Sequence, residues 1–194
     1  SNPIFEGCSN LSNVTIGNNV KTMPSYAFYN CGGLTSVTIG KSVTSIGSSA
    51  FYNCSKITNI YITDLTGWCE ISGLYNLMGY GSNDKNLYLN NILVTNLIIP
   101  DSVKTISSYA FYGCSKITSV TIPDSVISIG YGAFYNCSEI KDIYINDFTV
   151  WCDISGLRNL MCSNSSNKNL YSKDKPIKGV LIMSSKRTSI CDYA

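Results

Sequence analysis

The chain has 194 residues, of which 44% are hydrophobic and 13% charged, with a net charge of +2 and no histidine. The lack of histidine excludes serine–histidine and cysteine–histidine nucleophilic pairs, the commonest general base and most zinc sites. No apolar run approaches the roughly 18 residues of a membrane span, and no signal peptide is present, so we expect no membrane insertion by this chain.

The sequence repeats with a period of 23 residues, most clearly in its cysteine column (Cys8, Cys31, Cys54, Cys114 and Cys137). Twice the interval lengthens to 37 residues, so intervals of 23, 23 and 37 give a super-period of 83. Trp68-Cys69 therefore returns as Trp151-Cys152. Such a period, with recurring aliphatic columns, is typical of a solenoid in which each repeat forms one coil.

One regular coil, residues 34–54, shows how each repeat is expected to fold. Alternation predicts that Val37 and Ile39 point inward from a strand, and that Val43 and Ile46 line the opposite wall. The spacing of apolar residues in Ala-Phe-Tyr-Asn-Cys at 50–54 favours a short helical turn. Glycine or asparagine precedes each repeat cysteine, which predicts a left-handed backbone conformation at that position.

Coils are expected to start near residues 11, 34, 57, 94, 117, 140 and 177, and stacking them predicts a parallel sheet. Two of them carry inserts, at about 63–93 and 146–176. Each insert opens with a capping aspartate, Asp64 or Asp147, followed by one or two helical turns whose tryptophan faces inward. Asn90-Asn91 predicts a two-residue hairpin turn. We expect Phe51 and Phe111 to be almost fully buried in one continuous phenylalanine stack.

The pattern L-x-x-V-x-I-P-x-S-V-x-x-I-G-x-x-A-F-Y-x-C resembles the BspA-like leucine-rich repeats of bacterial and protist cell-surface proteins. The resemblance covers about residues 5–182 and includes the insert motif D-L-x-x-W-C…N-L-Y. It implies a leucine-rich-repeat-like, right-handed, β-rich solenoid that forms a single domain over residues 1–194. It also implies an extracellular or cell-surface location, with signal and anchor outside this chain, which we expect to be a fragment of a longer protein. The family implies binding, and it offers no catalytic motif to transfer.

The residues themselves indicate no enzyme, cofactor or metal site. Asp64 and Asp147 sit at helix caps, Asp101 and Asp124 follow prolines in outer turns, and no glycine-rich phosphate loop follows a strand. The repeat cysteines are expected to be buried free thiols, because side chains in parallel register point the same way. Cys69 and Cys152 are expected to behave likewise. Cys162 and Cys191 lie outside the repeat, and their state stays open.

The solvent side of the strands is the best candidate for ligand binding. It presents hydroxyl and amide side chains with two tyrosines, a surface suited to a sugar or a protein segment. The candidate residues are Thr38, Asn59, Tyr61, Thr121, Asp142 and Tyr144. In an alternative interpretation, the inserts cover Tyr61, Ile98, Tyr144 and Leu181 and make them a small satellite core. A second column, formed by Tyr29, Tyr52, Tyr112 and Tyr135, is expected to pack on itself, half-exposed.

Three functional classes fit these observations. The first is an adhesion module that recognises a host or neighbouring-cell protein or glycan, and the second is a structural spacer that displays another domain. An enzyme or regulator is the third. We expect no nucleic-acid partner, and the basic residues from Arg158 onward are expected to form a solvated surface rather than a site for an anion. The apolar N-terminal coil also predicts end-to-end self-association.

Overall fold

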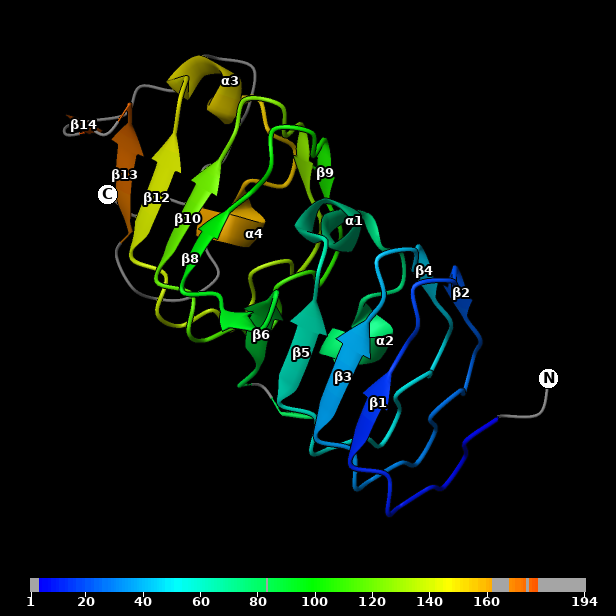
Figure 1. Cartoon of the computed structure of the whole chain (residues 1–194). Coiled ribbons are helices and arrows are strands. Elements are labelled where there is room, and N and C mark those ends of the chain that lie inside the picture. Colours follow the sequence, from blue (N-terminus) through cyan, green and yellow to red (C-terminus); the bar gives the residue numbers. More distant parts are fainter. Residues whose placement is uncertain (1–3, 83, 162–167, 174, 178–194) are drawn as a thin grey trace.

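The chain winds into an elongated stack of coils, shown by a computed structural model that describes residues 4–82, 84–161, 168–173 and 175–177 (Figure 1). The strands are β1 (Asn13–Thr15), β2 (Thr22–Met23), β3 (Ser36–Ile39), β4 (Ser45–Ile46), β5 (Asn59–Ile62), β6 (Asn86–Leu89), β7 (Ile92–Leu93), β8 (Asn96–Ile98), β9 (Thr105–Ile106), β10 (Ser119–Ile122), β11 (Ser128–Ile129), β12 (Asp142–Ile145), β13 (Asn169–Ser172) and β14 (Lys175–Pro176). The helices are α1 (Leu65–Glu70), α2 (Tyr75–Met78), α3 (Phe148–Cys152) and α4 (Arg158–Met161).

The main wall is two sheets, and not the single sheet that stacking of coils predicts. The first runs in the order β1-β3-β5-β6-β7 and the second β8-β10-β12-β13-β14. The cause is the predicted hairpin: Asn90 and Asn91 have φ angles of 51° and 64°, so β7 folds back antiparallel on β6. β7 thereby occupies the edge of β6 on which β8 would otherwise pair. Strand β6 lies within the predicted insert, yet it joins the sheet in parallel register with β5.

The interior follows the predicted columns. Val37, Ile39, Val43 and Ile46 are all buried, and the short pairs β2–β4 and β9–β11 form the opposite wall. The left-handed turn before each repeat cysteine is confirmed, with φ angles between 58° and 74° at Gly7, Asn30, Asn53, Gly113 and Asn136. The turns of adjacent coils therefore have the same conformation and lie above one another, and the apolar side chains of each coil pack against those of the next.

Both inserts begin as predicted. The Asp64 carboxylate accepts the N–H of Thr66 at 3.0 Å and caps α1, while Asp147 accepts two N–H groups at the start of α3. The two tryptophans that follow, Trp68 and Trp151, face the core and are buried. An aspartate cap is effective here because helices of five or six residues leave most of their first N–H groups without a partner inside the helix.

The phenylalanine column is buried but interrupted. Phe51 and Phe111 are both fully buried, as predicted. However, the rings form two stacks rather than one: Phe5 to Phe28 to Phe51, and Phe111 to Phe134, each step 5.2 Å between centroids. Between the stacks, α2 replaces the aromatic turn, and its Asn76 carbonyl accepts the Phe51 N–H. The long coil has no phenylalanine, and the buried side chains of α2 fill that layer instead.

The fold is therefore built from two blocks related by the 83-residue super-period. We call residues 4–93 the first block and residues 96–177 the second block; the junction between them is the joint. The hydrogen bonds across the joint include those from Trp68 Nε1 to the Ala110 carbonyl, from the Ser107 N–H to the Cys69 carbonyl, and from the Lys85 N–H to the Gly113 carbonyl (2.9, 2.8 and 2.7 Å). They join the blocks where no sheet pairing does.

Candidate functional site

The outward side chains of the main wall form one patch on each block. In the first block, Thr38 lies beside Tyr61 and Tyr61 beside Tyr88, on β3, β5 and β6. The rings of Tyr61 and Tyr88 stack with centroids 4.6 Å apart. In the next column the Asn86 amide donates to Asn59 Oδ1 at 3.0 Å. Thr38, Asn59, Tyr61, Asn86 and Tyr88 together are the first strand patch.

The second block presents the same arrangement with one change of charge. Thr121, Tyr144 and Tyr171 are neighbours on β10, β12 and β13, and the two tyrosine rings stack at 4.8 Å. Asn169 donates to Asp142 Oδ1 at 2.9 Å, in the place of the asparagine pair of the first block. Desolvation and then the Asp142 carboxylate raise the pKa of Tyr171. Thr121, Asp142, Tyr144, Asn169 and Tyr171 form the second strand patch.

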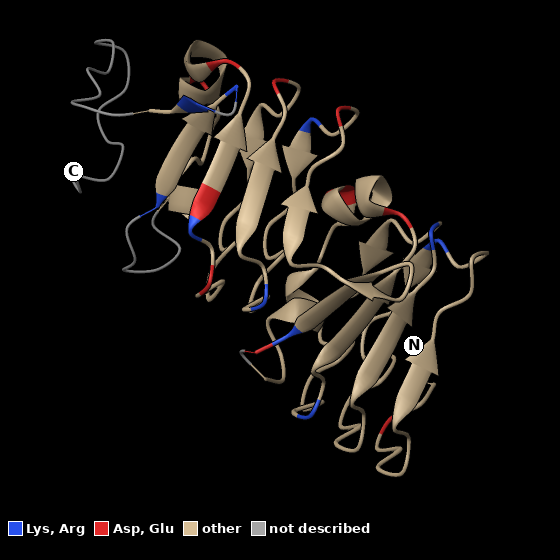
Figure 2. Ribbon diagram, turned by 60° about the vertical axis from the view of Figure 1, so that its left-hand side comes forward, with Lys and Arg blue, Asp and Glu red and all other residues tan. Residues whose placement is uncertain are grey.

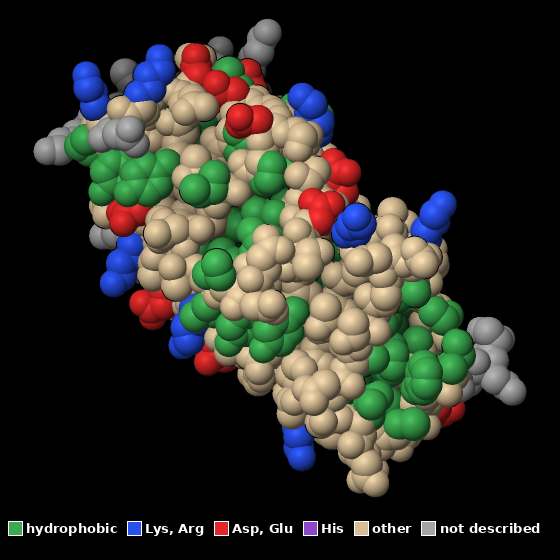
Figure 3. All heavy atoms as spheres, in the orientation of Figure 1, with side chains coloured by type: hydrophobic (Ala, Val, Ile, Leu, Met, Phe, Trp, Pro, Cys, Tyr) green, Lys and Arg blue, Asp and Glu red, His purple; other side chains and the backbone are tan. Residues whose placement is uncertain are grey.

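The structure thus places all six predicted residues on the solvent side of the strands, but it divides them between two patches. Figure 3 looks onto this side and shows hydrophobic side chains gathered over β12 and β13 and again near β6. Charged groups are concentrated in the loops between strands (Figure 2). The joint lies between the patches, so a ligand that contacts both must bridge it.

The interpretation that the inserts bury the strand-face residues is wrong for Ile98, whose side chain is 65% exposed. For Tyr61 and Tyr144 it holds in part: both are half-buried, and the rings that stack on them, Tyr88 and Tyr171, come from the inserts. Leu181 lies outside the described residues. The four tyrosines of the two stacked pairs are therefore partly accessible to solvent.

Sequence reasoning missed four members of these patches: Asn86, Tyr88, Asn169 and Tyr171. A signal was present, because Asn-Leu-Tyr at 86–88 has the same pattern as Asn-Ile-Tyr at 59–61. The interval of 27 residues between them differs from the repeat of 23, so the segment was interpreted as part of an insert. Comparing Asn-Leu-Tyr at 86–88 directly with Asn-Ile-Tyr at 59–61 would have predicted that residues 86–88 form a strand of the sheet.

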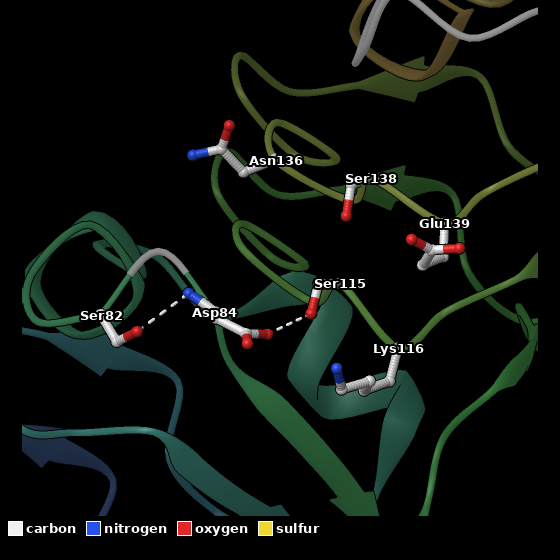
Figure 4. A pocket seen from close by; sticks show the side chains of 7 residues that line it. All are labelled: Ser82, Asp84, Ser115, Lys116, Asn136, Ser138 and Glu139. Atoms are coloured by element: carbon white, nitrogen blue, oxygen red, sulfur yellow. Dashed lines mark hydrogen bonds between the residues drawn. The ribbon is translucent and has the colours of Figure 1, made fainter.

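An open hollow of about 540 Å³ lies at the loops that precede the strands, lined by Ser82, Asp84, Ser115, Lys116, Asn136, Ser138 and Glu139 (Figure 4). The Ser115 hydroxyl donates to Asp84 Oδ1, which joins a loop of the first block to a loop of the second. The Asp84 N–H donates to the Ser82 hydroxyl at 3.0 Å. Both signs of charge are present, so the hollow has no strong preference for an ion of either sign.

The cysteine column supports structure rather than reactivity. All seven cysteines of the described residues are free thiols, namely Cys8, Cys31, Cys54, Cys69, Cys114, Cys137 and Cys152. Burial raises the pKa of Cys54, Cys69 and Cys114 to about 12, which keeps these thiols protonated and unreactive. The expectation of burial is wrong for Cys8, which is exposed, and holds only in part for Cys152, which is half-buried. Cys162 and Cys191 lie outside the described residues.

In the coil that lacks a repeat cysteine, a lysine is buried. Lys85 is 1% exposed, its ammonium donates to the Ser82 carbonyl, and it lies 5.9 Å from the centroid of the Tyr112 ring. Burial lowers the pKa of Lys85 to about 8, an effect that nearby Cys114 partly opposes. Lys168 is its equivalent in the second block, and burial lowers its pKa as well. A buried amine of this kind costs stability rather than forming a site.

Two further properties bear on the kind of site. Within the part of the chain that the structure describes, no three histidine, cysteine, aspartate or glutamate side chains gather as a metal site would require. Across the same residues, no helix has the length and apolarity to cross a bilayer. Both strand patches offer aromatic rings, hydroxyls and amides, and the second adds the Asp142 carboxylate.

The repeat register, the turn motif and the insert agree with one family. The BspA type leucine rich repeat region matches residues 1–70 and 83–191 in six copies. The chain belongs to this family. None of the curated proteins compared with the chain matches it.

Solved bacterial leucine-rich repeat proteins are similar to the chain. One from Treponema pallidum is 22% identical, with 72% of this chain and 58% of that chain covered and a TM-score of 0.41. A leucine-rich cell surface protein of Faecalibacterium prausnitzii is 26% identical, with coverage of 79% and 35% and a TM-score of 0.39. The pneumococcal vaccine antigen PcpA is 18% identical, with coverage of 86% and 42% and a TM-score of 0.40. The chain thus spans less than two thirds of the length of each.

Proposed function

We propose that this BspA-type repeat chain is a binding module of an extracellular, cell-surface protein, and that it recognises a protein or glycan of a host or neighbouring cell through its two strand patches. The observation that carries the proposal is the recurrence in both blocks of a stacked tyrosine pair beside a hydrogen-bonded side-chain pair, Asn86 with Asn59 in the first block and Asn169 with Asp142 in the second. Tyrosine combines a large apolar surface with a hydroxyl group, and it loses little conformational entropy on binding.

The solvent side of the strands supports recognition of an uncharged or weakly charged partner. The first strand patch contains no aspartate, glutamate, lysine or arginine, and the second contains one such residue, Asp142. Such a surface offers hydrogen bonds and aromatic contacts and little electrostatic steering. We propose neither catalysis nor nucleic-acid binding.

The test is adhesion of beads coated with the chain to cultured epithelial cells and to immobilised matrix proteins. Replacing Tyr61 and Tyr88 by alanine, or Tyr144 and Tyr171, should reduce adhesion at least severalfold, because each pair supplies an accessible aromatic surface. Thr15→Ala and Thr22→Ala, at exposed positions on strands β1 and β2, serve as matched controls. Unchanged adhesion in both tyrosine double variants would argue for the second candidate, a structural spacer.

The spacer candidate has its own support, because the coils within each block stack in register and the main wall has few charges to specify a partner. A spacer tolerates substitution along the whole strand face, whereas a binding module loses function at a few clustered positions. The extracellular location is tested separately, by protease treatment of intact source cells followed by detection of the chain.

A further inference from the structure

A third side of the solenoid carries two connected rows of tyrosines. The inner row consists of Tyr29, Tyr52, Tyr80, Tyr112 and Tyr135, one from each of five successive coils. Tyr29 stacks on Tyr52 with centroids 5.2 Å apart, and Tyr112 on Tyr135 at 5.6 Å, so the predicted self-packing of this column is confirmed. Tyr80 meets the edge of Tyr52 at 5.4 Å and extends the row from the insert.

The outer row consists of Tyr26, Tyr75, Tyr109 and Tyr131, and it carries the aromatic contacts across the joint. Tyr75 of the first block lies 4.9 Å from Tyr109 of the second, between ring centroids, and Tyr75 also contacts Tyr80 at 5.3 Å. The outer rings are tilted by 43–67° to their neighbours. Their faces are therefore not covered by stacking, and Tyr131 is 72% exposed. We call the two rows together the tyrosine belt.

The segments that form the belt carry no charged side chain. The five segments that form it, residues 24–31, 47–54, 72–82, 107–114 and 130–137, contain no aspartate, glutamate, lysine or arginine. Their polar groups are hydroxyls and amides, and the Asn53 amide donates to Asn30 Oδ1 at 2.8 Å beside the stacked Tyr29 and Tyr52. A ligand of this surface must be recognised without ion pairs.

Two tyrosines of the outer row, Tyr26 and Tyr109, adopt a strained backbone conformation. Tyr26 and Tyr109 have φ angles of 63° and 64°, and the equivalent residues of the neighbouring coils are Ser49 and Gly132. A left-handed conformation is unfavourable for a bulky side chain and free of cost for glycine. The solenoid accepts glycine here, yet two coils retain a tyrosine that projects into the belt.

We infer that the tyrosine belt binds an uncharged, extended polysaccharide, independently of the strand patches. Coils repeat at about 4.8 Å, and the sugar-to-sugar advance of an extended β-1,4-linked glycan is close to this spacing, so successive sugars meet successive coils. Tilted outer rings offer faces for sugar C–H groups, and the inner row offers hydroxyls for sugar hydroxyls.

A proline-rich peptide fits the belt less well. Such peptides insert prolines into grooves between aromatic rings. The stacked inner rings are inclined by only 10° and 17° and lie in contact, which leaves no groove between them. At one end the belt also adjoins the polar hollow, since Asn136, which lines the hollow, hydrogen-bonds the Tyr112 side chain. A sugar chain that leaves the belt would find further hydrogen-bonding groups there.

The test is calorimetric titration of the whole chain with cellobiose, cellotetraose, cellopentaose and cellohexaose. Affinity should rise with each added sugar up to five, one for each coil of the belt, and then level off. Maltohexaose has the same sugars but curls, so it should bind at least tenfold more weakly. A polyproline decapeptide serves as the probe for the peptide alternative.

Replacing Tyr75 and Tyr131 together by alanine should weaken cellohexaose binding roughly tenfold, since each loses an aromatic contact of modest strength. The matched control is Ile92→Ala with Ile127→Ala, at exposed positions outside the belt and the strand patches, which should leave this affinity unchanged. The strand-patch variant Tyr61→Ala with Tyr144→Ala distinguishes binding at the belt from binding at the strand patches. Circular dichroism and melting verify that the variants fold; if the belt variant does not, Tyr75→Ser with Tyr131→Ser replaces it. Absence of cellohexaose binding, equal binding of maltohexaose, preference for polyproline, or loss only in the strand-patch variant would each overturn the proposal.

Discussion

The two blocks share one sequence pattern but not one environment. Trp68 of the first block donates its indole N–H to the Ala110 carbonyl of the second. The equivalent Trp151 is equally buried, yet its indole N–H has no acceptor among the residues that the structure describes. The same residue thus completes an interface in the first block, whereas in the second no acceptor for it lies among the described residues. The Trp68 side of the joint therefore depends on the coil that follows the first block, which supplies the Ala110 carbonyl.

The helices at equivalent positions differ in a second way. Tyr75 opens α2 and connects the tyrosine belt across the joint, whereas its equivalent, which opens α4, is Arg158. An arginine cannot continue an uncharged aromatic row in the same manner. The two blocks therefore have similar interior residues but different surface residues. The belt does not continue through α4, because Arg158 stands where Tyr75 stands in the first block.

The largest expected effect concerns the interior shared by both blocks. Phe111→Ala should lower the free energy of unfolding by about 3–5 kcal/mol, because it leaves a cavity in a fully buried stack. Its equivalent Phe28 packs on Phe5, which is 45% exposed, so Phe28→Ala should cost less. Urea denaturation of both variants measures the difference. Equal costs would show that the exposure of Phe5 does not weaken the packing of Phe28, and that Phe28 and Phe111 are equally well covered.

The second effect is a pH dependence from Lys85. Its pKa is about 8 in the folded protein against 10.5 ordinarily, so between these values the unfolded chain binds more protons and stability rises with pH. The stability advantage of Lys85→Met over the native chain should therefore be larger at pH 7 than at pH 10.5, by about 2–3 kcal/mol. Lys168→Met is the control, and its smaller burial should give a smaller change. A difference that does not change with pH would show that Lys85 remains hydrated.

The third effect addresses the joint itself. Trp68→Phe should destabilise by about 1–3 kcal/mol, because the buried Ala110 carbonyl loses its donor. Trp151→Phe removes a donor that has no acceptor within the described residues, so it should cost about 1 kcal/mol less than the first substitution. Thermal denaturation of the two variants side by side makes the comparison. The reverse order would contradict the assignment of Trp68 as a residue of the joint.

The smallest effect concerns the insert helices. Asp64→Ala removes a single N-cap hydrogen bond and should cost about 1 kcal/mol. Asp147 accepts two N–H groups and the Thr149 hydroxyl, which hold the pKa of its carboxyl below the usual range, so Asp147→Ala should cost more. Because that pKa is depressed, the contribution of Asp147 should be lost as the solution is acidified through it. Melting curves at neutral and acidic pH check both statements.

The fold could be predicted in detail because each coil repeats the same physical requirements. Inward Val37 and Ile39, the asparagine or glycine before each cysteine, and the Asp64 cap were all readable from residue type and spacing. The division into two sheets was not, since it depends on β7 taking the edge that β8 would occupy. That choice is a competition between two pairings, and local propensity does not decide it.

The candidate site was predicted less completely. Outward positions such as Tyr61 follow from alternation alone, but the stacking of Tyr61 on Tyr88 required knowing that a segment 27 residues later enters the sheet. The continuity of the tyrosine belt was also hidden, because Tyr75 and Tyr80 belong to the insert and have no counterpart in the regular repeat. Comparing repeats identifies the residues that recur in each coil, but it does not identify residues such as Tyr75 and Tyr80, which occur once and complete the belt.

The joint also has a mechanical consequence. Within a block, pulling the two ends apart must peel successive parallel strands, whereas at the joint no strand pairing crosses between the sheets. Tension along the stack would therefore part the blocks first, releasing the contacts of Trp68 and Tyr75 while both sheets stay intact. The hairpin at Asn90-Asn91 lies at that point, and its unfolding would lengthen the molecule in one step without exposing either core along its length.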